Sequence, residues 1–135
     1  MYQTNDFTDL IGIPFKDRGR DLNGLDCWGL AKIVFKRYGQ DIPDYNICCE
    51  DITNIDKTID KQRSYWQKIE KPVAPCLVVM HLGTKFCNHT GVYIGNGRFI
   101  HTRDKVGVNI DRIDSINWKN RIEGFYLPPN KKVKT

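Results

Sequence analysis

Apolar residues recur at intervals of three and four between Leu30 and Tyr38, which is the period of a helix with one buried face. Asp26 precedes this run and is a good N-cap, because its carboxylate can accept hydrogen bonds from the free N–H groups of the first turn. Gly39 suits the left-handed position just past a helix end. The pattern predicts a helix that begins at Cys27 and ends near Tyr38.

Two further helices are expected from weaker signals. A short helix is predicted over 6–11, and the polar stretch 16–24 then forms a loop that leads to Cys27. Isoleucines and Trp66 at helical spacing predict a second amphipathic helix over about 53–68, with a charged outer face.

The second half of the chain is typical of strands, because short apolar runs alternate there with turn residues. The run 76–82 is expected to be a strand buried on both faces, and Trp118 falls in a loop over 114–120. Helices followed by antiparallel strands in a meander indicate an α+β domain. The other predicted strands are 89–94, 98–103, 106–110 and 121–127.

Composition adds little to this picture. The 135 residues, 40% of them hydrophobic, are enough for one domain over 1–128, and 129–135 is expected to be a disordered basic tail. The net charge of +5 comes with no nucleic-acid motif, and no run approaches the ~20 apolar residues of a membrane span. We therefore expect no nucleic acid and no membrane as partner. The start of the chain lacks a secretory signal, so synthesis in the cytoplasm is expected.

Cys27 is the candidate nucleophile, although a single cysteine is more often an inert core residue. Partial positive charge at a helix start favours a thiolate, and the free N–H groups there can hold an oxyanion. The base would be His89, with His101 fixing its tautomer, since both lie on the arms of one predicted hairpin. Without that hairpin, His101 would be taken for an ordinary strand histidine.

The hairpin register decides whether the two histidines can meet, because strand side chains alternate between faces. A two-residue loop of Asn96 and Gly97 would put His89 and His101 on different faces. A three-residue loop over 95–97, with Gly97 as a bulge, makes them diagonal neighbours and sets Gly91 opposite His101. We predict the three-residue loop, with Gly91 leaving room for the start of the Cys27 helix.

No metal or other cofactor is expected. The odd number of cysteines at irregular spacing argues for reduced thiols, and no Cys-x-x-Cys pair occurs. A set made of Cys76, Cys87 and His81 or His89 resembles no common ligand spacing.

Two motifs resemble the NlpC-type cysteine peptidases. They are Leu25-Asp26-Cys27-Trp28-Gly29-Leu30 and the stretch 88–101, which reads Asn-His-Thr-Gly-Val-Tyr-Ile-Gly-Asn-Gly-Arg-Phe-Ile-His. The resemblance runs from about Ile11 to Leu127. The Cys-Trp-Gly-Leu form and the ending around Trp118 are most similar to the bacteriophage-tail branch of this family.

The resemblance implies a papain-like α+β fold with Cys27 as nucleophile, His89 as base and His101 as third member. It implies hydrolysis of peptidoglycan stem peptides, at the amide between D-glutamate and a diamino acid. It also implies a place in a virion tail, acting at the bacterial cell wall beside other phage tail proteins. Substrate contacts are expected at Phe15, Asp26, Trp28 and Gly91.

Two departures from the family pattern bear on rate and substrate. Many members have Tyr where this chain has Phe15, and many have Gly-Asp where it has Pro75-Cys76. Two alternatives stay open on the residues alone. One is a cytoplasmic thiol amidase or acyltransferase that uses the same triad, and the other is a non-catalytic structural tail protein.

Overall fold

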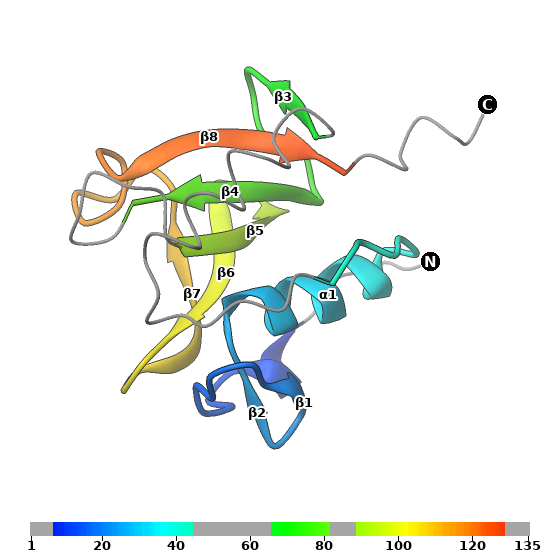
Figure 1. Cartoon of the computed structure of the whole chain (residues 1–135). Helices are drawn as coiled ribbons and strands as arrows, with labels where there is room; N and C mark the ends of the chain where they lie inside the picture. Colours follow the sequence, from blue (N-terminus) through cyan, green and yellow to red (C-terminus); the bar gives the residue numbers. More distant parts are fainter. Residues whose placement is uncertain (1–6, 45–65, 82–88, 129–135) are drawn as a thin grey trace.

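The computed structural model describes residues 7–44, 66–81 and 89–128 (Figure 1). A 3-10 turn η1 (Thr8–Leu10) is followed by a two-stranded ribbon, one helix and a sheet of six strands. The ribbon and helix are β1 (Arg20–Asp21), β2 (Gly24–Leu25) and α1 (Cys27–Arg37), and the sheet strands are β3 (Gln67–Ile69), β4 (Cys76–Met80), β5 (His89–Gly95), β6 (Arg98–Arg103), β7 (Gly107–Arg112) and β8 (Ile122–Leu127).

The six-stranded sheet has the order β3-β8-β4-β5-β6-β7, and every neighbouring pair is antiparallel. The strands β4 to β7 form the predicted meander. β8 does not continue it, because the chain returns from β7 and places β8 against the free edge of β4.

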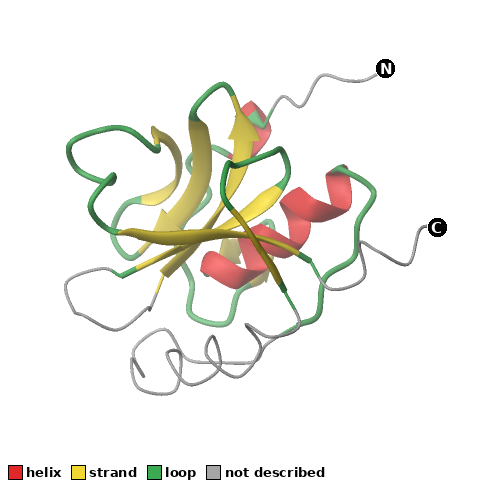
Figure 2. Cartoon of the chain, turned by 90° about the horizontal axis from the view of Figure 1, so that it is seen from above, coloured by secondary structure: helices red, strands yellow, loops and turns green. Residues whose placement is uncertain are grey.

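α1 lies across one face of the sheet, against β5 and β6 (Figure 2). Its buried stripe is the predicted one and includes Leu30, Val34 and Phe35. These side chains pack against Val92 and Ile100 in the larger of two hydrophobic clusters. Burial of this stripe fixes the position of α1, since helices of this length depend on tertiary packing.

The opposite face of the sheet holds the smaller cluster, which contains Val78, Met80, Phe99 and Trp118. Trp118 lies in the turns between β7 and β8, as the sequence predicts, and only 3% of it is exposed. All five residues of β4 are buried, because the larger cluster, which includes Leu77 and Val79, covers one face of this strand and the smaller cluster covers the other.

The predicted helices other than α1 need correction. The helix expected over 6–11 is only the short turn η1. Most of the helix predicted over 53–68 lies outside the described residues, but its end is wrong, because Gln67–Ile69 is strand β3. β3 pairs with β8, and this tertiary partner is invisible to a periodicity argument.

The turn between β5 and β6 also differs from the prediction. Gly95 pairs with Arg98, so the loop has two residues, Asn96 and Gly97, both with positive φ. A bulge between Tyr93 and Gly95 adds one residue to β5. That extra residue restores the register that a three-residue loop would have given, so the predicted loop was wrong but the predicted alignment of the two arms was right.

Within the described residues, no helix is both long enough and apolar enough to cross a membrane.

Asp26 fixes the start of α1. Asp26 is 3% exposed, and its carboxylate accepts hydrogen bonds from the N–H of Gly29 at 2.7 Å and from the N–H of Arg18 at 3.0 Å. The guanidinium of Arg20 forms an ion pair with it at 2.7 Å. Gly29 has no room for a side chain, because an added Cβ would collide with the carbonyl of Gly19. The first turn is therefore held from two sides.

We expect Asp26→Ala to lower the free energy of unfolding by about 2–3 kcal/mol, because it removes a cap and leaves a part-buried guanidinium without this partner. Asp26→Asn should lose less, since its amide oxygen can still accept from Gly29. Urea unfolding followed by circular dichroism measures both. Asp41→Ala is the control, because the exposed Lys36–Asp41 pair is worth little. Equal stability of Asp26→Ala and wild type would contradict this role.

Candidate active site

Cys27 is the first residue of α1 and is half-buried. Its sulfur lies beside Thr90 of β5, whose amide and hydroxyl both act to lower the pKa of the thiol. The hydroxyl of Thr90 is buried, and within the described part of the chain it has no hydrogen-bond partner of ordinary geometry. The beginning of α1 and the beginning of β5 therefore meet at this sulfur.

The ladder between β5 and β6 ends next to the sulfur. Its last pair is Val92 with Ile100, although β5 continues to His89 along β4 and β6 continues to Arg103 along β7. Thr90 lies beyond that pair, and its amide faces the sulfur of Cys27.

A hydrogen bond between two imidazoles joins the two strands beyond the end of their ladder. His89 Nε2 lies 2.8 Å from His101 Nδ1, and both side chains are buried. Trp118 packs against both rings, stacked on His89 and edge-on to His101. The structure therefore brings together the two histidines that the sequence singled out.

Both imidazoles are uncharged near neutral pH. Burial holds the pKa of His89 well below its usual value, and repulsion from a protonated His101 and from the charge of Arg103 acts in the same direction. Burial also lowers the pKa of His101, although Asp111 opposes it. An uncharged imidazole can accept a proton, as a general base must.

The prediction that the helix start lowers the pKa of the Cys27 thiol is wrong, because that pKa lies above its usual value. Burial raises the pKa of the thiol, and the negative charge of Asp26 raises it further. Thr90 and Arg20 oppose this without reversing it. The site therefore holds a protonated thiol and uncharged imidazoles, in place of the thiolate that the helix start alone would favour.

No hydrogen bond joins the Cys27 sulfur to either imidazole among the residues that the structure describes. The sulfur is nevertheless against Thr90, which directly follows His89 in the chain. His89 Nε2 faces His101, so Nδ1 is the nitrogen left for another partner. Catalytic hydrogen bonds are often long before substrate binds and tighten in the complex with substrate.

The four predicted substrate contacts fall into different environments. Phe15 is half-buried and bridges to Leu25, two residues before the sulfur. The carboxylate of Asp26 is engaged by α1 and its neighbours, as described above. Trp28 lies in the core, donates to the carbonyl of Pro43 at 2.7 Å and packs edge-on to Trp66, so its placement does not fit a substrate contact.

Gly91 has a closer neighbour than the predicted helix start. A Cβ at Gly91 would lie 3.0 Å from the Ile100 carbonyl oxygen and 3.1 Å from His101 Cβ. The missing side chain thus makes room for β6 and for the third member of the predicted triad.

The sequence analysis missed Asp111. Its carboxylate oxygen Oδ2 lies 2.8 Å from His101 Nε2, which extends the pair to a row of three groups. The predicted strand stopped at Ile110, two residues too early, because β7 runs to Arg112. An alternation counted from Asn109, the partner of His101, would have put Asp111 on the same face.

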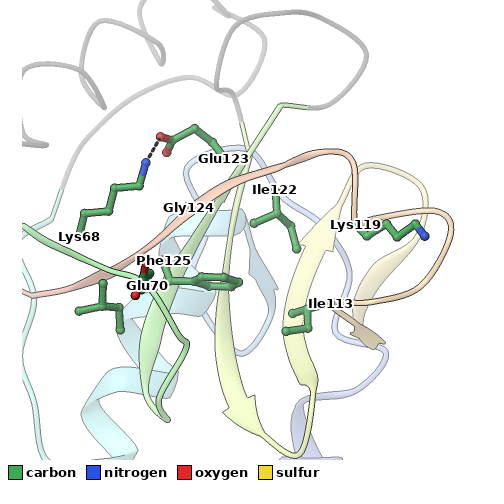
Figure 3. Close-up of a pocket in the computed structure, with 9 residues that line it drawn as sticks. Lys68, Glu70, Ile113, Lys119, Ile122, Glu123, Gly124 and Phe125 are labelled. Carbon is green, nitrogen blue, oxygen red and sulfur yellow. Dashed lines mark hydrogen bonds and ion pairs between the residues drawn. The ribbon is translucent and has the colours of Figure 1, made fainter.

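In the described residues, no group of three or more metal-ligating side chains is arranged to hold an ion. Cys87, part of the metal set weighed above, lies outside these residues. A pocket of about 380 Å³ lies over β3 and β8 (Figure 3), with Ile113, Ile122 and Phe125 among its lining residues. Lys68 and Glu123 also line this pocket and form an ion pair with each other at 3.0 Å. None of the site residues lines it.

The chain belongs to the NlpC/P60 family, whose model matches residues 12–126. It is 27% identical over 123 residues to the probable peptidoglycan endopeptidase LytE of Bacillus subtilis, covering 89% of this chain and 32% of that protein. It is 24% identical over 118 residues to the murein DD-endopeptidase/LD-carboxypeptidase MepS of Escherichia coli K12, covering 85% and 55%. The chain thus spans between about a third and about half of these relatives.

The fold is shared with solved structures of the family. An NlpC/P60 family protein from Bacillus cereus ATCC 10987 superimposes with a TM-score of 0.65 at 23% identity, covering 90% of this chain and 38% of that one. The predicted fold class is therefore confirmed. It is the α+β papain-like fold of this family, with a helix that starts at Cys27 packed on an antiparallel sheet.

We expect the stability of the protein to fall as the pH drops below 6.5, the ordinary pKa of histidine. There the unfolded chain takes up a proton at His89 that the folded protein, with its lowered pKa, does not bind. His89→Gln should reduce the slope of unfolding free energy against pH by up to about 1.4 kcal/mol per pH unit. Urea unfolding in a series of buffers measures this slope, and parallel curves for the two proteins would refute the assignment.

We expect Gly91→Ala to disturb His101 more than its small volume suggests, because the new methyl group meets β6 backbone and the His101 Cβ. The free energy of unfolding should fall by about 1–3 kcal/mol, as in overpacked cores. The imidazole resonances of His89 and His101 should shift in NMR spectra. Unchanged resonances and an unchanged free energy of unfolding would contradict this prediction, because β6 would then accommodate the methyl group without being disturbed.

Proposed function

We propose that this chain hydrolyses peptide bonds in peptidoglycan through Cys27, His89 and His101. One observation carries the proposal. In a chain of the NlpC/P60 family, a thiol at the start of α1 lies against the residue after His89, and His89 is hydrogen-bonded to His101. Relatives named as peptidoglycan and murein endopeptidases support the choice of substrate.

The first half of the reaction forms a thioester. As the Cys27 sulfur attacks the carbonyl carbon, the S–H bond breaks and its proton passes to Nδ1 of His89. N–H groups in the first turn of α1 stabilise the oxyanion that forms. The resulting imidazolium of His89 gives its proton to the leaving amine, and the C–N bond breaks.

The second half releases the acid. His89 takes a proton from a water molecule, the hydroxide attacks the thioester, and the C–S bond breaks. The thiol is then restored with the proton held by His89. Because the resting thiol has a raised pKa and the resting imidazole a lowered one, proton transfer accompanies attack and no ion pair forms beforehand.

The bond that we propose is the amide between D-glutamate and the diamino acid of the stem peptide. Its support is the resemblance of the Cys27 and His89 motifs to the family. MepS is named for two activities, DD-endopeptidase and LD-carboxypeptidase, so its name does not point to this bond. Mass spectrometry of purified muropeptides after digestion distinguishes these bonds by the fragments released.

We also propose that the enzyme acts from a phage tail at the cell wall. This finer assignment rests only on the Cys-Trp-Gly-Leu form at Cys27 and the ending around Trp118. Its test is the genetic neighbourhood of the coding sequence. Neighbouring tail genes would support the assignment, and neighbouring cell-wall or metabolic genes would favour a cellular role.

Incubation with purified peptidoglycan tests the activity. We expect wild type to release new amino groups, and Cys27→Ala to reduce the rate by roughly 10³-fold or more. Cys76→Ala is the matched control, because it also removes a thiol, one that is buried in β4 and has its pKa raised to about 12 by burial. It should retain the wild-type rate.

Two outcomes would overturn the proposal. Amine release by Cys27→Ala at the wild-type rate would exclude Cys27 as nucleophile. A folded wild type that releases nothing from Gram-positive and Gram-negative walls would favour one of the two alternatives, a thiol amidase or acyltransferase with another substrate, or a structural protein. Assay on small acyl amides and thioesters then separates these two.

A further inference from the structure

Asp111 stands at the far end of the histidine pair from Cys27. It belongs to β7, where it is the register partner of Phe99, and its side chain is 33% exposed. His101, fully buried, bridges between Asp111 and His89 with a distance of 2.8 Å on each side. These three groups form one continuous row of hydrogen bonds.

The direction of every hydrogen bond in this row follows from its last member. An ionised carboxylate can only accept, so the proton between Asp111 and His101 belongs to His101 Nε2. An uncharged imidazole carries a single N–H, so His101 Nδ1 must be an acceptor. The proton in the next hydrogen bond then belongs to His89 Nε2, and the lone pair of His89 is left on Nδ1.

We propose that Asp111 is a positioning residue that sets the tautomers of both histidines, so that His89 presents a free lone pair at Nδ1. Without Asp111, the proton between the two imidazoles can belong to either ring. One of these two arrangements puts a proton on His89 Nδ1 and disables it as a base. The part of the proposal that concerns catalysis rests on the function proposed above.

The charges around the pair agree with this assignment. Arg103 lies over the ring of Trp118 at 5.4 Å, and its positive charge disfavours protonation of both histidines. Asp111 is the acidic group that faces His101 and acts in the opposite direction. When His89 becomes an imidazolium during the reaction, Asp111 is placed to stabilise that charge through His101.

NMR of the protein with ¹⁵N-labelled histidine tests the proposal without any substrate. At neutral pH we expect both His89 and His101 of wild type to carry the proton on Nε2 alone. In Asp111→Leu, which cannot accept a hydrogen bond, both rings should show a mixture of tautomers. Asp111→Ala is the second variant if Asp111→Leu does not fold, and Asp114→Leu is the matched control, because it removes an exposed acid that pairs with Arg112.

Two results in these spectra would overturn the proposal. One is a proton on Nδ1 of His89 in wild type, and the other is an unchanged tautomer pattern in a folded Asp111 variant. Because neither depends on hydrolysis, the test stands even if peptidoglycan is not the substrate.

Activity provides the second readout. We expect Asp111→Leu to lower kcat roughly 10- to 100-fold with little change in KM, because the residue orients the base and does not touch substrate. Asp114→Leu should retain wild-type kcat. A loss in KM alone would indicate a substrate contact and would contradict a positioning role.

Discussion

The site depends on one buried hydrogen bond, which joins two strands beyond the point where their backbone ladder ends. The hydrogen bond between His89 Nε2 and His101 Nδ1, 2.8 Å long, connects β5 and β6 where their backbone pairing has ended. Past the end of that ladder each strand keeps an outer neighbour, β4 for β5 and β7 for β6. Thr90 lies in this part of β5, and its amide faces the sulfur of Cys27.

Burial of this pair has an electrostatic consequence. Enclosed by Trp118 and close to Arg103, the imidazoles are held uncharged, and the thiol is likewise held protonated. The partial charge of a helix start acts on Cys27, but desolvation is the largest effect on its pKa and acts against ionisation. The site is therefore built for a base that removes a proton during attack.

Much of the fold could be predicted from periodicity. The helix beginning at Cys27, the buried strand β4 and the hairpin arms all follow from local patterns that the structure preserves. The loop of the hairpin was mispredicted because a bulge at Ile94 and a longer loop produce the same register. β3 was mispredicted as helix because its reason for being a strand is its partner β8.

The sequence by itself determined which residues could carry the chemistry, because caps, turns and strand alternation act over a few positions. It placed Cys27 at a helix start and aligned His89 with His101. Tertiary structure decided the ionisation of these groups, since burial depends on the packing of segments that are distant in the sequence. Asp111 was missed because the predicted strand ended at Ile110, and the folded chain pairs the rest of β7 with β6. It also assigned Trp28 to the core, because the carbonyl of Pro43 and the ring of Trp66 reach it only in the folded chain.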